Sequence, residues 1–152
     1  ILTTGGVSVG EKDLLPGVIE NLNGNVLFHG IQVKPGMPTM LSVVKGTPVL
    51  SLSGNPFAVE ALFEVLAGGY LTDMEASRYL QKNQMKILKQ TFVKTGKMKR
   101  IVKGRCDESG VYLPQIQKNG QLKNGIGSNC LVIFPEGERT YTEGEVVWVI
   151  RI

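Results

Sequence analysis

The fold is decided by a glycine-rich stretch near the start of the chain, Thr3-Thr4-Gly5-Gly6-Val7-Ser8-Val9-Gly10-Glu11-Lys12-Asp13. Apolar Ile1-Leu2 precedes it, and apolar residues at helical spacing follow it over about 14–22. The pattern predicts a strand, a glycine loop and a helix. Clustered glycines indicate positive φ or close approach of the backbone to a ligand. Such a loop offers free N–H groups to an anion, and a tight turn without a ligand is the alternative.

Two more loops of the same chemical kind follow extended segments. Lys34-Pro35-Gly36-Met37-Pro38 comes after expected strands at 26–28 and 31–33. Ser53-Gly54-Asn55-Pro56 comes after an expected buried strand at 47–52. Ligands of open α/β sheets bind in the crevice at the carboxyl ends of the strands. We therefore expect the three loops to meet in one polar pocket.

The residues around the third loop predict local structure. A strand is expected at 39–44, ahead of the strand at 47–52. Asn55 as N-cap with Pro56 at the first helical position is a common start of a helix, here an apolar one running to about residue 66.

The texture changes near residue 84, where short β-type runs alternate with turn signals. Asp107–Gly110 and Lys118–Gly120 read as hairpin turns. Several short strands in so few residues predict a small β-barrel or sandwich. The expected strands are 85–92, 98–106, 111–113, 131–134 and 146–152. We therefore predict an α/β domain at 1–72, a polar helical connector at 73–83 and an all-β domain at 84–152.

Charge follows the same division. The chain has 152 residues and a net charge of +4, but residues 1–75 carry −4 and residues 76–152 carry +8. No acidic residue occurs between Ala76 and Cys106. Nucleic-acid binding is one reading of this stretch. We favour a solvated basic face, because Tyr79 and Phe92 are too few aromatic residues for base stacking.

Other function classes receive little support. No apolar run is long enough for a membrane span, and no signal peptide is recognised. Cys106 and Cys130 have neither disulfide-framework nor zinc spacing, which favours a reducing cytoplasm. Gly6-Val7-Ser8-Val9-Gly10 matches the nucleophile-elbow pattern of hydrolases. His29 is the single histidine and reads as a strand residue, so a hydrolase triad is disfavoured.

The three loops together resemble a known family. The first stretch, then Phe28-His29-Gly30-Ile31-Gln32-Val33-Lys34-Pro35-Gly36 with Pro38, then Leu52 with Gly54-Asn55-Pro56, occur in the order of the molybdopterin-binding domain. The chain is most similar to molybdopterin molybdenumtransferases of the MoeA and gephyrin E-domain type. Asn129–Gly137 and Gly144–Val149 resemble that family's C-terminal β-barrel. The resemblance implies the C-terminal half of a three-layer α/β domain followed by a small barrel.

The resemblance also implies a function and a site. Such proteins insert molybdenum from molybdate into adenylylated molybdopterin with a divalent cation, here expected to be Mg²⁺. Homodimers and an adenylylating partner are implied as well. Asp13 is the implied catalytic and metal-binding residue, and Lys34 the implied cation for the substrate. The implied molybdopterin-binding residues are Thr4, Gly5, Gly6, Ser8, Gly10, Lys34, Pro35, Gly36, Pro38, Ser53, Gly54, Asn55 and Pro56.

The sequence also departs from the family. Met37 stands where the family commonly has Lys, and Ser53 where it has Pro. We expect the chain to be a fragment that lacks the family's N-terminal domains and the first half of the α/β domain. On that reading it is inactive alone and exposes a sheet edge that favours association. A non-catalytic molybdopterin-binding or scaffold module is the alternative function.

Overall fold

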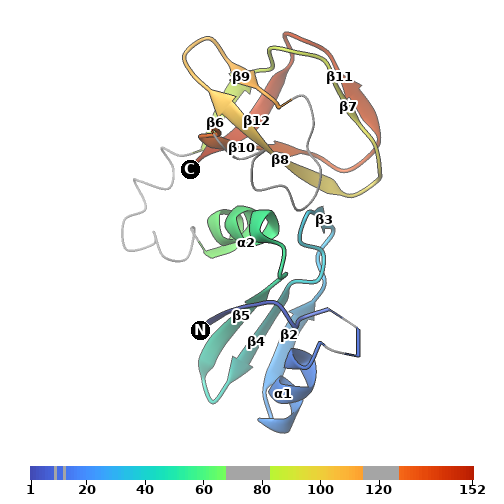
Figure 1. Ribbon diagram of the computed structural model, residues 1–152, viewed down its shortest axis with the longest axis vertical. Helices are drawn as coiled ribbons and strands as arrows, with labels where there is room; N and C mark the ends of the chain where they lie inside the picture. Colours follow the sequence, from blue (N-terminus) through green and yellow to red (C-terminus); the bar gives the residue numbers. More distant parts are fainter. Residues whose placement is uncertain (9, 12, 68–82, 115–126) are drawn as a thin grey trace. The chain divides into compact units, whose positions relative to one another are not determined.

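A computed structural model describes residues 1–8, 10–11, 13–67, 83–114 and 127–152. They divide into two compact units, Ile1–Leu62 and Phe63–Ile152 (Figure 1). Most of the predicted connector at 73–83, and the turn predicted at Lys118–Gly120, lie outside the described residues. The predicted domain boundaries therefore stay a prediction. No helix in the described part of the chain is long and apolar enough to cross a membrane.

Unit 1 is built on one mixed sheet with strand order β1-β5-β4-β2. Strand β1 runs parallel to β5, and the other neighbours are antiparallel. Both predicted helices form, as do the strands predicted at 39–44 and 47–52. The elements are β1 (Leu2–Thr4), α1 (Leu15–Asn21), β2 (Asn25–His29), β3 (Val33–Lys34), β4 (Met40–Val44), β5 (Thr47–Leu52) and α2 (Pro56–Leu62).

Two local details follow from residue chemistry. The Asn55 side-chain oxygen accepts hydrogen bonds from the N–H groups of Phe57 and Ala58, at 3.0 and 3.2 Å. The predicted N-cap is confirmed, with Pro56 as the first residue of α2. The strand predicted at 31–33 is largely wrong, because Gly30 (φ 97°) turns the chain and leaves only the short β3.

The core of unit 1 lies between α1 and one face of the sheet. Met40 pairs with Ser51, and Ser42 with Val49, so these four side chains share that face. Ile19 of α1 packs there with Met40 and Val49. This packing fixes α1, and with it the chain that leads into the helix.

Unit 2 contains a sheet with the order β8-β10-β12-β6, with β9 pairing to β8. Leu88, just after β6, forms a bridge with Val111 of β9, and the Lys89 N–H donates to the Val111 carbonyl at 2.9 Å. The bridge links the two outer strands of this sheet. The strands are β6 (Asn83–Ile87), β7 (Phe92–Lys94), β8 (Lys99–Cys106), β9 (Val111–Tyr112), β10 (Cys130–Phe134), β11 (Arg139–Tyr141) and β12 (Val146–Arg151).

Most of these strands lie where the sequence predicts them, but two short strands, β7 and β11, were not predicted. The strand predicted at 85–92 is wrong in extent, since β6 ends at Ile87 and Phe92 begins the separate strand β7. The pair β7–β11 was missed because each strand has only three residues. The turn at Asp107–Gly110 is confirmed by the β8–β9 hairpin.

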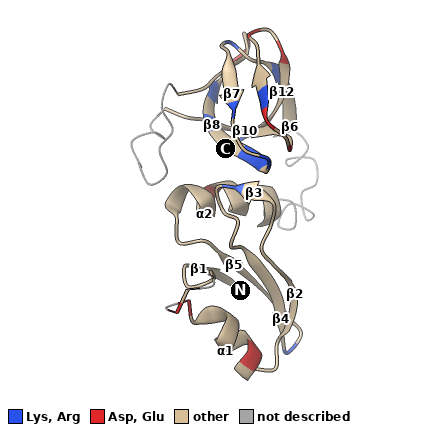
Figure 2. Cartoon of the chain, turned by 90° about the vertical axis from the view of Figure 1, so that its right-hand side faces the viewer, with Lys and Arg blue, Asp and Glu red and all other residues tan. Residues whose placement is uncertain are grey.

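Unit 2 has its own core and a basic surface. Inward-facing residues of its strands are almost fully buried, among them Val102, Val132 and Val149. Figure 2 shows Lys and Arg on several of its strands, including the Lys99–Cys106 strand β8. The basic stretch of the sequence therefore contributes exposed cations as well as core residues.

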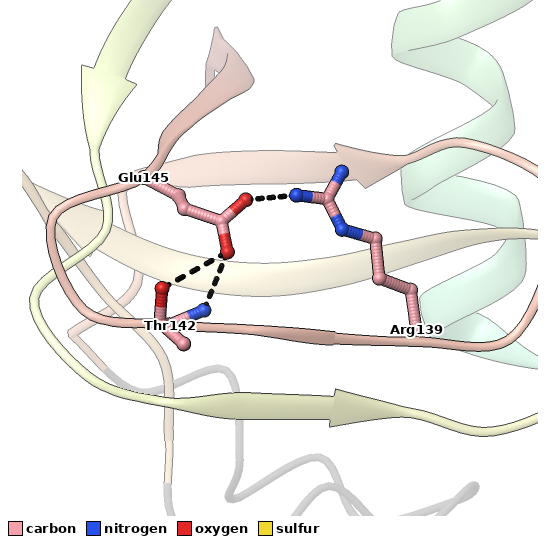
Figure 3. A network of polar contacts seen from close by, with 3 residues as sticks. All are labelled: Arg139, Thr142 and Glu145. Atoms are coloured by element: carbon pink, nitrogen blue, oxygen red, sulfur yellow. Dashed lines mark hydrogen bonds and ion pairs between the residues drawn. The ribbon is translucent and has the colours of Figure 1, made fainter.

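A polar network closes the turn between β11 and β12 (Figure 3). The Thr142 N–H donates to Glu145 Oε1 at 2.7 Å, the Thr142 hydroxyl donates to the same oxygen at 3.1 Å, and Arg139 pairs with Oε2. These contacts, led by the Thr142 N–H, hold the pKa of the Glu145 carboxyl below its usual value of 4.5. The carboxylate is thus stabilised as the anion in the folded protein.

We expect the contribution of Glu145 to stability to depend on pH. Because the folded-state pKa is lowered, the contribution is complete above about pH 4.5 and is lost as the pH falls through the folded value. The urea midpoint of Glu145→Gln should lie below that of the wild type at pH 7, and the gap should shrink at pH 3. Glu143→Gln, on the same turn, is the control. A gap that stays constant with pH would contradict this role.

We expect removal of the Ser51 hydroxyl to be harmless. Ser51 is buried, and its hydroxyl has no partner among the described residues. The buried Thr39 hydroxyl instead donates to the Gly36 carbonyl at 2.7 Å. Ser51→Ala should leave the free energy of unfolding unchanged or raise it by up to about 1 kcal/mol, whereas Thr39→Val should lower it by about 1–2 kcal/mol. Equal losses in urea melts of both variants would refute this difference.

Candidate functional site

The three glycine loops leave the sheet of unit 1 at the same edge. Thr4 ends β1 opposite Leu52, which ends β5. Met40 begins β4 opposite Ser51, and His29 ends β2 opposite Met40. Loop 1 (residues 5–14), loop 2 (residues 30–39) and loop 3 (residues 53–55) therefore start or end along one line. The rule used in the sequence analysis was for parallel strands. In this mixed sheet, loop 2 reaches the edge because β2 ends and β4 begins there.

Loops 1 and 3 touch through glycine backbones. A Cβ atom placed on Gly54 would lie 3.4 Å from Gly5 Cα. Gly5 has φ 81°, and its N–H donates to the Leu52 carbonyl at 2.9 Å. The absence of side chains at both positions allows this approach. Thr4, at the end of β1, is exposed next to the contact.

Loop 2 packs against α2, the helix that follows loop 3. Gly36 has φ 106°, and a Cβ atom there would lie 2.2 Å from Leu62 Cδ1 and 3.5 Å from Ala58 Cβ. The loop is closed by hydrogen bonds from the Gly30 N–H to the Thr39 carbonyl and from the Ile31 N–H to the Met37 carbonyl, at 2.8 and 2.9 Å. Helix α2 therefore anchors both loops: loop 2 packs against it, and loop 3 leads into its first residue.

The Lys34 side chain, the charged group of loop 2, is exposed to solvent. Lys34 is exposed, and the Lys34–Pro35 peptide bond is cis. Pro35 and Pro38 are half-buried, and Met37 is 45% exposed. Met37 therefore offers an apolar surface where the related family commonly has a cation.

Asp13 is tied to loop 1 rather than to helix α1. The Gly10 N–H donates to Asp13 Oδ2 at 3.1 Å, and the Asp13 N–H donates to the Gly10 carbonyl at 2.9 Å. Helix α1 begins at Leu15 and has no acidic residue in its first turn. Asp13 therefore precedes α1, and the hydrogen bonds that hold its carboxylate and its N–H come from loop 1.

The loop geometry decides which backbone donors are available. The N–H groups of Gly5 and Gly10 already donate within the protein, to Leu52 and Asp13. Among the described residues, the N–H groups of Gly6 and Ser8 have no acceptor. An anion at this edge would therefore use the Gly6 and Ser8 amides rather than all four predicted groups.

Loop 3 is shaped by its own side chains. The Ser53 hydroxyl accepts a hydrogen bond from the Asn55 N–H at 3.3 Å. The Asn55 side chain caps α2, so its observed role is structural. Ser53 thus closes this turn with a hydrogen bond, whereas a proline at this position would stiffen the turn through its ring.

The site offers few ligands to a metal. The described residues contain no group of three His, Cys, Asp or Glu side chains that could hold an ion. Asp13 is the one carboxylate among the predicted site residues. Mg²⁺ commonly uses one or two carboxylates together with water and substrate phosphates. The residues present therefore fit a magnesium ion shared with a phosphate-bearing substrate.

His29 is a strand residue, as predicted, because it ends β2, and its ring also contacts loop 1. Its Nε2 lies 2.6 Å from the Val7 carbonyl oxygen of loop 1. The signal in the sequence was its position, at the end of a strand and before a glycine. Because the imidazole bonds to Val7 and not to the Ser8 hydroxyl, the geometry does not support the serine-hydrolase alternative.

We expect Gly36 to tolerate substitution less well than Gly30. An alanine at Gly36 would clash with buried Leu62, in addition to the strain of φ 106°. At Gly30 (φ 97°) the nearest atom is the Met37 carbonyl oxygen at 3.9 Å, so only the strain applies. Gly36→Ala should lower the free energy of unfolding by about 3–5 kcal/mol and Gly30→Ala by about 1–2 kcal/mol. Equal losses in denaturant melts would contradict the contact with Leu62.

Comparison with known proteins gives consistent results. Residues 1–73 match the model of a probable molybdopterin binding domain. The molybdopterin molybdenumtransferase of Staphylococcus aureus strain COL is 29% identical over 155 residues, which cover 99% of this chain and 37% of that protein. The Staphylococcus epidermidis strain ATCC 12228 protein of the same name is 26% identical with the same coverage. The chain thus spans about 37% of the length of these curated relatives.

Solved structures agree with the sequence comparison. The crystal structure of the molybdopterin biosynthesis MoeA protein of Pyrococcus horikoshii matches with a TM-score of 0.78 and 26% identity, covering 99% of this chain and 36% of that one. A molybdenum cofactor biosynthesis protein of Pyrococcus furiosus shares the fold, with a TM-score of 0.69 and 22% identity over 94% of this chain and 55% of that one. The resemblance drawn from the three loops is thereby confirmed: over nearly its whole length the chain is similar to molybdopterin molybdenumtransferases of the MoeA type.

Proposed function

We propose that the shared edge of unit 1 binds molybdopterin, and that the chain acts in a transferase that inserts molybdenum from molybdate into adenylylated molybdopterin. The meeting of loops 1, 2 and 3 at one edge carries this proposal. The loops that leave this edge carry two unpartnered N–H groups, an exposed lysine and a carboxylate, and these groups suit an anionic substrate.

The residues have distinct roles in this proposal. The Gly6 and Ser8 amides donate to a phosphate oxygen, and hydrogen bonds to charged acceptors are stronger than neutral ones. Lys34 adds a positive charge on a flexible stem. No protein nucleophile is required, because positioning and electrostatic stabilisation can lower the barrier.

The proposed cation would be held by Asp13. The hydrogen bond from Gly10 occupies Oδ2 and leaves Oδ1 for the metal. A bound Mg²⁺ would supply positive charge that offsets the negative charge of the substrate. The chain's own contribution is to keep the carboxylate oriented, through the paired contacts of Asp13 with Gly10.

The finer architecture belongs to the same proposal. We infer that unit 1 is part of a three-layer α/β domain and that unit 2 is a small barrel. The bridge between Leu88 and Val111 supports the barrel, because it joins the outer strands of the β8-β10-β12-β6 sheet with its β9 extension. Homodimer formation, an adenylylating partner and a cytoplasmic location are carried over from the family resemblance.

One observation favours a second candidate, a module that binds molybdopterin without catalysis. Met37 replaces a cation that the family commonly has, so loop 2 carries Lys34 as its one positive charge. A site with weaker attraction for molybdate would still hold the pterin phosphate.

Substitution of Asp13 separates the two candidates. In a molybdenum-inserting protein that carries this sequence, Asp13→Ala should reduce molybdenum insertion by at least about 100-fold, since it removes the metal-binding carboxylate. Molybdopterin affinity, measured by fluorescence titration, should change by less than about threefold, because the phosphate donors remain. Glu11→Ala, in the same loop, is the control. Unchanged insertion would remove Asp13 from the site, and absence of insertion in the wild type would favour the binding module.

A further inference from the structure

We infer that His29 is a positioning residue for loop 1, and that its imidazole sets the direction of the Ser8 N–H group. The inference rests on the proposed function, because it concerns how the same edge recognises an anion. His29 was not among the residues that the family resemblance implied for the site.

The contact has a defined direction. The His29 Nε2 lies 2.6 Å from the Val7 oxygen, and a carbonyl oxygen can only accept. The imidazole therefore carries a proton on Nε2 and donates it. His29 is the last residue of β2, and its backbone pairs with Met40 of β4, so the backbone that carries the ring is held in the sheet.

Val7 is held from more than one side. Its side chain is 1% exposed and packs in the core with Ile19, Met40 and Val49. Its carbonyl is held by His29. The preceding Gly6 carbonyl accepts the Leu15 N–H at 3.0 Å, which anchors the loop to α1. The core packing fixes the position of the Val7 side chain, and the contact with His29 fixes the orientation of the Val7–Ser8 peptide plane.

The orientation of the Val7–Ser8 peptide plane determines the direction in which the Ser8 N–H points. In a trans peptide the C=O of one residue and the N–H of the next point in opposite directions. With the Val7 carbonyl held toward His29, the Ser8 N–H must point away from β2. That N–H has no acceptor among the described residues. The histidine thus holds a free donor in a set direction without touching the ligand itself.

Loop 1 needs such a restraint because of its composition. Gly5 and Gly6 have φ of 81° and 65°, and glycine moves readily between such conformations. Without the imidazole, the peptide after Val7 could rotate while the Val7 side chain stayed in the core. Binding would then have to order the loop, and ordering lowers affinity.

Two variants of the 152-residue chain test the inference. His29→Leu removes the donor, and His29→Gln keeps an N–H donor at the end of a side chain. The first measurement, on the ligand-free protein, is the ¹H–¹⁵N heteronuclear NOE of Gly6 and Ser8. The second is the dissociation constant for molybdopterin from fluorescence titration. The third is the thermal unfolding transition.

His29→Leu should lower the NOE at Gly6 and Ser8 and weaken molybdopterin binding about fivefold, as expected for one hydrogen bond. His29→Gln should restore both, and each variant should keep a single cooperative thermal transition, which shows that the fold is retained. Unchanged NOE values in His29→Leu would overturn the inference, as would weaker binding that His29→Gln fails to restore. If the wild type does not bind molybdopterin, the proposed function fails, while the ligand-free NOE still decides the role of His29.

Discussion

The structure of the site depends on the parallel pairing of β1 with β5. This pairing places the end of β1 beside the end of β5 and brings Gly5 against Gly54. This contact fixes the start of loop 1, and Val7, His29 and the contacts between Asp13 and Gly10 hold the residues that follow. The pairing is non-local, since it joins residues about fifty positions apart, and it therefore requires the β4–β5 hairpin to be formed correctly. The N–H groups of a glycine loop point in a fixed direction only when paired strands hold both the loop and its neighbours in place.

The elements that the sequence predicts correctly are those determined by residues close together in the chain. Asn55-Pro56 places the start of α2 because a side-chain cap and a proline act within a few residues. The buried run Thr47–Leu52 became β5 with the same limits, because turn residues bound it on both sides. The meeting of the three loops was also expected. The strand pairings place the loop ends along one edge, because β2 ends and β4 begins there, and the shared polar pocket stays a prediction.

The remaining features depend on contacts between distant residues. Nothing near His29 in the sequence shows that its ring reaches Val7, and nothing near Gly10 shows that its amide is taken by Asp13. Strands β7 and β11 are short and pair with each other across more than forty residues, so neither has a local pattern. Which glycine amides remain free is a property of the assembled loop. Composition predicts an anion site in the loop, whereas the tertiary contacts determine which N–H groups stay without an acceptor.

The contact between Gly36 and Leu62 has an evolutionary consequence. The two positions lie on different loops and elements, yet the space available to one is set by the other. A side chain at 36 would clash with Leu62 and would also be strained by φ 106°, so glycine should be retained at 36 among related chains, and the side chain at 62 should stay within the space that glycine leaves. Their pairing joins the segment that carries Lys34 to the helix that Asn55 begins. Divergence in this lineage would then be restricted at these two positions, which keeps loop 2 against α2 while the exposed residues of loop 2 vary freely.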